Sequence, residues 1–227
     1  MCGLYNLSHT SDEVAAYFDY GETVEFPPRD YVAPGQPVAI VRREEHDPTG
    51  GRHFALVRWG FVPSWAKEVK TGKPLINARA ETISEKPSFK NAFRRRRCLV
   101  PASGFYEWQG DVPGRKQPYY VPRADGGVVA FAGIWEHWMG NDGSELESMA
   151  IITTEANERL SGIHHRMPVV VAQEDFARWL GPEEDAGDLL CAAGNDYFAP
   201  ERTEMKRAAA KKPPAPSSAG SQQLDLF

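Results

Sequence analysis

The sequence VVAFAGIW at residues 128–135 is the clearest strand signal in the chain. It is a run of β-branched, aromatic and small apolar residues that follows the pair Gly126-Gly127, and paired glycines are typical of a turn. An apolar run bounded by turn residues predicts a β-strand. We therefore expect a β-sheet to be the framework of the molecule.

Other runs on both sides of this segment have the same character, at residues 38–42, 54–59, 98–101, 118–121, 149–154 and 167–172. Short helices are expected near 87–96, 155–162 and 173–180, and one more follows a first strand, with Ser11 as its N-cap and Asp12 and Glu13 in its first turn. Helices long enough for parallel crossovers do not alternate with the strands. The pattern predicts an α+β fold: a single β-rich domain with a curved, mostly antiparallel sheet and short helices.

The length of 227 residues suits one domain, which we place at 1–198, with a flexible tail at 199–227. The tail is rich in Ala, Lys, Pro, Ser and Gly, and Pro213, Pro214 and Pro216 disfavour regular structure there. It ends in three large apolar side chains within Gln223-Leu224-Asp225-Leu226-Phe227. A tail cannot bury these side chains itself, so the pattern favours a docking peptide.

The composition limits the class of protein. The 3 cysteines are widely spaced and form no CxxC pair, so neither a disulfide framework nor a zinc site is indicated, and we expect no cofactor. No signal peptide or membrane span is visible, which predicts a cytoplasmic protein with no membrane partner. The net charge of -5 argues against attraction of nucleic acid over the whole surface. A local basic strip between residues 76 and 107 is nevertheless expected, from Arg79, Lys86, Lys90, Arg94, Arg95, Arg96 and Arg97.

The chain begins Met1-Cys2-Gly3, and removal of Met1 would leave Cys2 with a free α-amine beside its thiol. A 1,2-aminothiol can attack an acyl carbon through sulfur, or condense with an aldehyde to an imine that the thiol closes into a thiazolidine. Read alone, Cys2 is equally a small residue without a role.

Several polar residues stand in apolar or glycine-rich surroundings. Asn77, after Leu75-Ile76, is either a turn-former or a hydrogen-bonding group aimed at a substrate. Glu107 lies between aromatic residues, which favours a general acid or base, although a strand Glu paired with a nearby arginine is an alternative. His164 and His165 enter a strand and are either structural or functional. The arginines at 94–97 fit a solvated helix end or a DNA contact.

Four segments together are similar to the SRAP family of SOS response-associated peptidase-like proteins, which shield abasic sites in single-stranded DNA. They are Met-Cys-Gly at the start, PLINARAET at 74–82, RRCLVPASGFYEW at 96–108 and IHHRMPVVV at 163–171. The resemblance covers residues 1–198, in the family's order. It implies a mixed, β-rich fold with a positive channel, and a thiazolidine between Cys2 and the ring-opened sugar.

The resemblance also implies roles for individual residues. The catalytic set would be Cys2, Asn77, Glu107 and His164. Asn77 would hold the amino terminus or the adduct, Glu107 would handle protons, and His164 would assist opening of the sugar ring. Contacts to DNA would come from Arg79, Arg166, Trp108 and Pro34. The chain departs from the family's pattern at Tyr31 and Leu4, where Asn and Arg are common, so finer DNA contacts near these positions are not carried over.

The terminal Gln223-Leu224-Asp225-Leu226-Phe227 resembles the peptide with which bacterial proteins dock on the replication sliding clamp, which implies a bacterial protein associated with the nucleoid. A monomer is the default expectation. Other functions stay open: an N-terminal-nucleophile cysteine amidohydrolase, a thiol peptidase that uses Cys2, His164 and Glu107, including one that processes itself, and non-covalent DNA binding.

Overall fold

The computed structural model describes residues 3–21, 24–44, 50–69, 74–112, 114–181 and 185–205. Two of the predicted features lie outside these ranges: Cys2 with its preceding Met1, and the terminal peptide 223–227.

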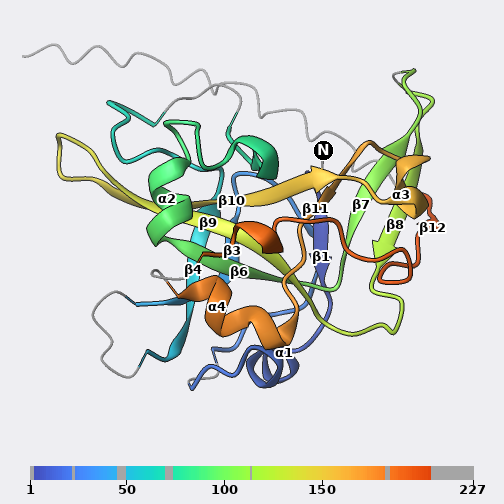
Figure 1. Cartoon of the computed structure of the whole chain (residues 1–227), viewed down its shortest axis with the longest axis horizontal. Helices are drawn as coiled ribbons and strands as arrows, with labels where there is room; N and C mark the ends of the chain where they lie inside the picture. The colour runs from blue at the N-terminus through green and yellow to red at the C-terminus, as the bar shows by residue number, and fades with distance from the viewer. Residues whose placement is uncertain are drawn as a thin grey trace, which may run out of the picture.

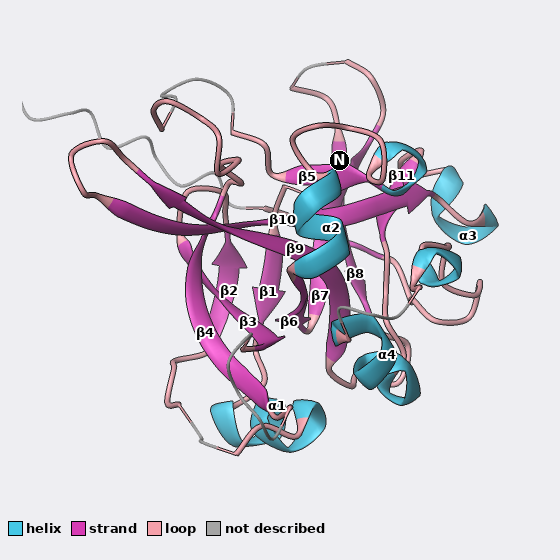
Figure 2. Ribbon diagram, turned by 60° about the vertical axis from the view of Figure 1, so that its left-hand side comes forward, coloured by secondary structure: helices cyan, strands magenta, loops and turns pink. Residues whose placement is uncertain are grey.

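The larger sheet contains a closed ring of five strands. Strand β9 pairs with β6 on one side and β10 on the other, and β4 pairs with both β3 and β10. A single residue pair joins β3 to β6 and completes the ring. All contacts in the ring are antiparallel except β4 with β10 (Figures 1 and 2). The ring strands are β3 (Pro37–Arg43), β4 (Arg52–Trp59), β6 (Arg97–Ala102), β9 (Val129–Met139) and β10 (Glu145–Glu155).

Two short strands pair with the end of β10. Strand β5 (Asn77–Arg79) runs parallel to it, and β11 (Arg166–Pro168) runs antiparallel to its last residues. A second sheet has the order β12-β8-β7-β1-β2. Its strands are β1 (Tyr5–Leu7), β2 (Arg29–Val32), β7 (Gly104–Gln109), β8 (Gln117–Pro122) and β12 (Glu201–Arg202). The prediction of a β-rich, mostly antiparallel fold with short helices is confirmed.

Alternation of side chains divides the core into two clusters. One face of the ring strands packs with the second sheet, where the ring of Phe131 lies edge-on to Tyr5 and Phe105 at centroid distances of 6.2 and 6.1 Å. The opposite face packs against the helices through Phe18, Ala92 and Trp179. The strand predicted at 128–135 is therefore buried on both faces, which accounts for its nearly continuous apolar sequence.

The helices are short, as predicted: α1 (Ser11–Phe18), α2 (Lys90–Arg95), α3 (Glu158–Ser161) and α4 (Phe176–Leu180), with 3-10 turns η1 (Ala80–Thr82), η2 (Gln173–Asp175) and η3 (Gly187–Leu189). The prediction of Ser11 as N-cap is wrong. Thr10 caps α1, because its side chain accepts from the Glu13 amide while the Glu13 carboxylate accepts from the Thr10 amide at 2.8 Å. Within the described ranges, no helix has the length and apolar character needed to cross a bilayer.

Three other expectations differ from the structure. The strand expected at 167–172 is shorter, since β11 ends at Pro168 and Val170 makes only an isolated bridge to Phe131. Asn77, which read alone suggested a turn, lies in β5. Beyond residue 198, where the tail was expected, Glu201 and Arg202 form β12 against β8. Backbone pairing with β8 thus continues into the expected tail.

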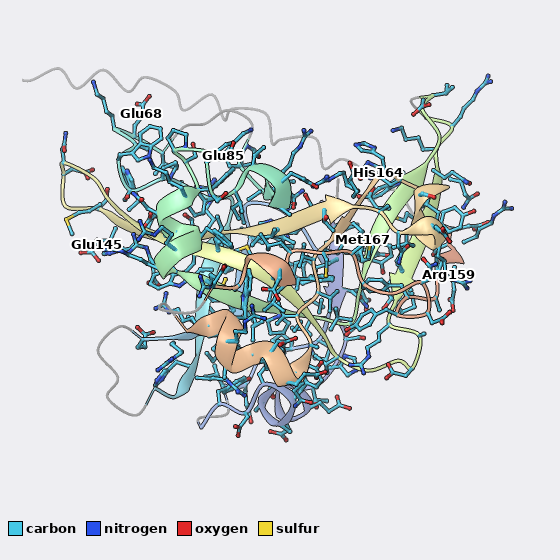
Figure 3. The ribbon with its side chains drawn as sticks, viewed as in Figure 1. Glu68, Glu85, Glu145, Arg159, His164 and Met167 are labelled. Atoms are coloured by element: carbon cyan, nitrogen blue, oxygen red, sulfur yellow. The ribbon has the colours of Figure 1, made fainter. Side chains whose placement is uncertain are left out.

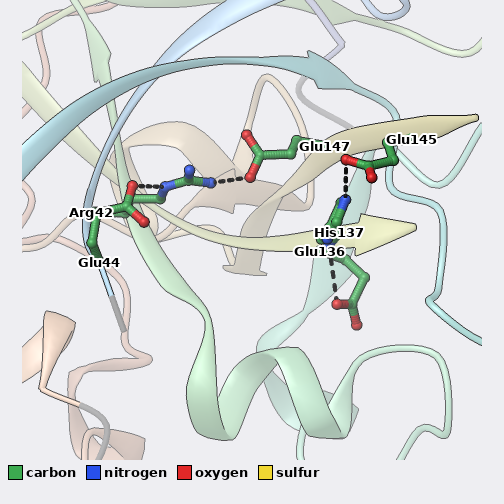
Figure 4. A network of polar contacts seen from close by, with 6 residues as sticks. All are labelled: Arg42, Glu44, Glu136, His137, Glu145 and Glu147. Atoms are coloured by element: carbon green, nitrogen blue, oxygen red, sulfur yellow. Dashed lines mark hydrogen bonds and ion pairs between the residues drawn. The ribbon is translucent and has the colours of Figure 1, made fainter. Parts of the chain in front are cut away.

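A network of ion pairs connects the ring strands β3 and β10 (Figure 4). The Arg42 guanidinium contacts Glu44 at 2.9 Å and Glu147 at 2.7 Å, and it lies 3.9 Å from the centre of the Trp135 ring. These contacts provide partners for the buried guanidinium of Arg42 and indicate a structural role for this residue.

Replacing Phe131 with Ala should destabilise the protein strongly, because the side chain is fully buried where the two sheets meet. Large-to-small core changes of this kind cost about 3 to 5 kcal/mol. Leu56→Ala is the matched control, since Leu56 lies on β4 but is 58% exposed, and we expect a change within about 0.5 kcal/mol. Urea unfolding measures both free energies. Equal, small losses for the two variants would contradict this description of the core.

Candidate active site

The candidate site forms where β10 leaves the ring. Asn77 starts β5 and is paired with Ile151, and Arg79 at the end of β5 is opposite Thr153. The Trp59 indole donates to the carbonyl of Ile76 at 2.9 Å, which fixes the backbone just before Asn77. Asn77 is half-buried and Arg79 is exposed. Short pairing with β10, rather than a turn, therefore sets the position of the asparagine.

Glu107 comes from β7, in the second sheet. Its strand is paired with β8 on one side and β1 on the other, and the Tyr106 amide donates to the Leu4 carbonyl at 2.9 Å. The Glu107 side chain is only 4% exposed. A buried carboxyl group that faces a histidine from another segment is a candidate for a functional role.

His164 lies in the loop between α3 and β11, at the upper edge of the molecule in Figure 3. Asn157 caps α3 by accepting from the Leu160 amide at 3.0 Å, and the Leu160 carbonyl accepts in turn from the His164 amide at 3.0 Å. The Gln109 side chain, from β7, donates to the Gly162 carbonyl at 2.7 Å. These contacts hold the loop against the strand that carries Glu107.

The two side chains meet: His164 Nδ1 lies 3.9 Å from Glu107 Oε1. The backbone of Arg166 offers Nδ1 two partners: its amide lies 2.9 Å away and donates when the ring proton is on Nε2, and its carbonyl lies 3.2 Å away and accepts when the proton is on Nδ1. Burial lowers the pKa of His164, the Glu107 charge raises it, and the positive charge of the amino terminus lowers it further. His164 is therefore mostly neutral at neutral pH.

The His165 ring stacks on His164, with centroids 4.3 Å apart and planes at 28°. His165 is exposed, so it covers one face of the less exposed His164 ring. Sequence reasoning treated His165 only as a neighbour, because a doubled histidine gives no indication of stacking.

Arg166 is buried, with its side chain 8% exposed. Its guanidinium donates to both carboxylate oxygens of Glu81, at 2.7 and 2.9 Å, and to the Thr153 carbonyl at 2.5 Å. A contact between Arg166 and a phosphate stays a prediction. Neither Glu81 nor Gln109 was identified from the sequence.

The other two residues expected near DNA lie on β7 and in a turn. Trp108 is half-buried on β7, next to Glu107. Pro34 lies in the turn 33–36, where Gly35 has a φ of 87° and its amide donates to the Trp59 carbonyl at 2.7 Å. Pro followed by Gly with positive φ is typical of a type II turn. Their contacts with DNA stay predictions.

The four arginines at 94–97 divide into two pairs. Arg97 is buried and donates to the carbonyls of Trp179, Phe93 and Gly181, and Arg96 pairs with Glu136 at 2.8 Å. Arg94 and Arg95 are exposed at the end of α2. Only these last two are therefore placed to act as a solvated basic patch.

The described part of the chain contains no cluster of His, Cys, Asp and Glu side chains that could hold a metal ion. It brings together the Glu107 carboxyl group and the His164 imidazole, whose pKa is lowered, from segments that are distant in the sequence. Asn77 lies on β5 beside β10, and its place next to these two groups stays a prediction. Such a set can transfer protons and orient a polar reactant.

Comparisons with known proteins identify the family of the chain. Residues 1–207 match the family model of the SOS response associated peptidase (SRAP). The chain is 37% identical over 202 residues to the abasic site processing protein YoqW of Bacillus subtilis, covering 88% of each chain, and 33% identical over 212 residues to YedK of Escherichia coli, covering 87% of this chain and 90% of YedK.

A crystal structure of a Bacteroides thetaiotaomicron protein superimposes with a TM-score of 0.79 at 27% identity, covering 89% of this chain and 92% of that one. Both the sequence and the architecture are thus shared over nearly the whole described chain. The chain belongs to the SOS response associated peptidase (SRAP) family.

Proposed function

We propose that this protein processes abasic sites in DNA, by forming a covalent thiazolidine between Cys2 and the sugar of an abasic site in single-stranded DNA. Both curated relatives described above carry the name abasic site processing protein. In this role the protein detects the abasic site and shields it. It would act in the cytoplasm at the nucleoid, as a monomer.

The observation that carries the proposal is the register of β1 against β7. Tyr5 is opposite Phe105, and the Leu4 carbonyl accepts from Tyr106, so each step back along β1 is a step forward along β7 toward Glu107. Cys2 is two residues before Leu4, and adjacent Cα atoms are about 3.8 Å apart. This register supports a position for the Cys2 amine and thiol within reach of Glu107 and His164.

The proposed chemistry starts with the closed hemiacetal of the abasic sugar. His164 donates a proton to the ring oxygen while a base accepts the proton of the anomeric hydroxyl, which exposes the aldehyde at C1′. Glu107 accepts a proton from the Cys2 ammonium, because only a neutral amine can add to a carbonyl carbon.

The amine then forms a C–N bond, water leaves, and addition of the thiol across the resulting imine forms the C–S bond of the thiazolidine. One water is lost overall, and no oxidant or reductant is needed. Holding amine, thiol and aldehyde together makes the ring closure intramolecular, an effect worth about 7 to 11 kcal/mol in well-oriented systems.

In this proposal Asn77 holds the amino terminus or the adduct by hydrogen bonds, and Arg79 and Arg166 contact the flanking phosphates. Trp108 and Pro34 lie beside the strand of DNA. Arg79 is exposed at the end of β5, which supports its part directly. The guanidinium of Arg166 contacts Glu81 in this structure, so its part as a phosphate contact rests on the family resemblance alone.

Removal of Met1 must precede this reaction. The family's description as a peptidase favours self-processing. In this reaction the Cys2 thiol attacks the Met1 carbonyl and the peptide C–N bond breaks, which leaves a thioester and the free Cys2 amine. Water then hydrolyses the thioester, releasing methionine and restoring the thiol, while His164 and Glu107 transfer the protons. A host aminopeptidase would yield the same mature chain. The alternative function is that of a thiol peptidase or an N-terminal-nucleophile amidohydrolase with other substrates. The first experiment below would favour this alternative if the mature protein formed no adduct.

The mature protein should form a heat-stable adduct with single-stranded DNA that contains one abasic site. Cys2→Ala and a form that retains Met1 should form none, because each lacks one of the two groups of the aminothiol. Cys191→Ala is the matched control, since Cys191 is exposed and lies outside the site, and it should react like the wild type. Denaturing gels measure the shifted band. Absence of this band for the mature wild type would remove the proposal.

His164→Ala should slow adduct formation by about a hundredfold or more, as expected for loss of a general acid. The rate for the wild type should be bell-shaped in pH: it falls in acid as the amine becomes protonated, and it falls in alkali as His164 loses its acidic form. The variant should lose the alkaline decline. An unchanged profile would exclude His164 as the acid. Single-turnover rates across pH provide the measurement.

We also propose that Gln223 to Phe227 bind the replication sliding clamp, on the sequence resemblance alone. Deleting Gln223-Leu224-Asp225-Leu226-Phe227 should abolish binding to a bacterial sliding clamp in a titration, because the motif's apolar anchors are removed, while adduct formation stays the same. The matched control is deletion of an equally long segment from 214–218. Equal clamp affinity with and without the terminal peptide would refute this role.

A further inference from the structure

We propose that Glu81 is a positioning residue for this site: by holding Arg166 it fixes the orientation of the His164 ring and ties the Asn77 strand to β11. This inference rests on the proposed function for its kinetic readout. Its second readout, the titration of His164 in the protein without DNA, does not.

The first step is the contact between Glu81 and Arg166. Both carboxylate oxygens accept from the guanidinium, at 2.7 and 2.9 Å, in the paired geometry that arginine favours. The Arg166 side chain is 8% exposed, whereas that of Glu81 is 43% exposed. A buried guanidinium that loses its carboxylate partner is strongly destabilised in place, so the arginine would have to move. The pKa of Glu81 is lowered chiefly by this hydrogen bond, so the pair persists well into the acid range.

The second step leads from Arg166 to His164. The backbone of the same Arg166 contacts His164 Nδ1 through its amide at 2.9 Å and its carbonyl at 3.2 Å, so one backbone unit holds the ring in either tautomer. Movement of Arg166 would loosen these contacts. Glu81 therefore acts on the imidazole through one intermediate residue.

The third step is the position of the ion pair in the fold. Thr153 of β10 is opposite Arg79 of β5 on one side and Pro168 of β11 on the other, and its carbonyl also accepts from Arg166. Strand β5 and strand β11 each have only three residues. Glu81, in η1 directly after β5, thus links two short strands across the end of β10. The link joins the segment that follows Asn77 to the strand that follows His164.

The sequence alone does not indicate this role. Glu81 is two residues from Arg79, which makes a local ion pair the simplest expectation, whereas the partner in the structure is 85 residues away. The basic residues of the segment also suggest that an acidic residue there only balances charge. The contact with a buried arginine distinguishes Glu81 from Glu85, which is exposed on the same segment.

The experiment compares Glu81→Gln, Glu81→Asp and the matched control Glu85→Gln in the full chain. For adduct formation with abasic single-stranded DNA we expect Glu81→Gln to be slower by about tenfold or more, as for loss of orientation in a site. Because Arg166 is also proposed to contact a phosphate, the rates are compared at saturating DNA, where a change in affinity does not enter. Glu81→Asp, which keeps the charge, should recover part of the rate, and Glu85→Gln should match the wild type.

The second measurement is the NMR titration of the His164 ring in each variant, assigned with His164→Ala. The charged groups that act on this ring are Glu107, the amino terminus and His165, and all three are unchanged in these variants. Burial lowers the pKa of His164 and its hydrogen bond with the Arg166 backbone raises it, so a reoriented ring should titrate at a shifted pKa in Glu81→Gln and at the wild-type pKa in Glu85→Gln.

An unmoved His164 titration in Glu81→Gln would overturn the inference, even if the rate falls through general loss of stability. A wild-type protein that forms no adduct would instead remove the proposed function, and the titration would still decide whether Glu81 positions His164.

Discussion

The candidate site depends on one constraint, the branching of backbone pairing at the end of β10. Residues 148–149 of this strand pair with β4, the next residues pair with β5, and the last three pair with β11. The ring of strands holds β10 in place, so β5, which carries Asn77, and β11, which follows the loop of His164, take fixed positions. Without this branching, β5 and β11 would not lie on the two sides of Thr153 at the end of β10.

The second sheet contributes the remaining part of the site. Its strand β7 presents Glu107 to the loop of His164, and Gln109 on the same strand holds that loop through Gly162. Because β1 runs beside β7, the same sheet also guides the start of the chain toward Glu107. A reaction that uses the first residue of a mature chain needs such guidance, since a free terminus pays a large entropy cost when it is ordered.

Much of this fold follows from the sequence, and the limits are physical. Long apolar runs such as 128–135 and 149–154 predicted strands correctly, because burial on both faces leaves a clear pattern. Strands β5 and β7 lack that pattern: Asn77 and Arg79 are polar, and Glu107 stands between aromatic residues. The ring closure was also not predicted, since it depends on pairing between segments far apart in the sequence. The cap of α1 was predictable, because Thr10 and Glu13 have the capping-box spacing.

The candidate residues were identified through family resemblance, because no spacing in a sequence brings residues 77, 107 and 164 together. The structure shows that Glu107 and His164 lie close together. The central claim is that Cys2 of the mature chain reacts beside these two side chains. Tandem mass spectrometry of the digested adduct tests it most directly. The account predicts an amino-terminal peptide that starts at Cys2 and carries the deoxyribose fragment with the loss of one water, bonded through both nitrogen and sulfur. A fragment attached to a lysine, or to no peptide, would contradict it.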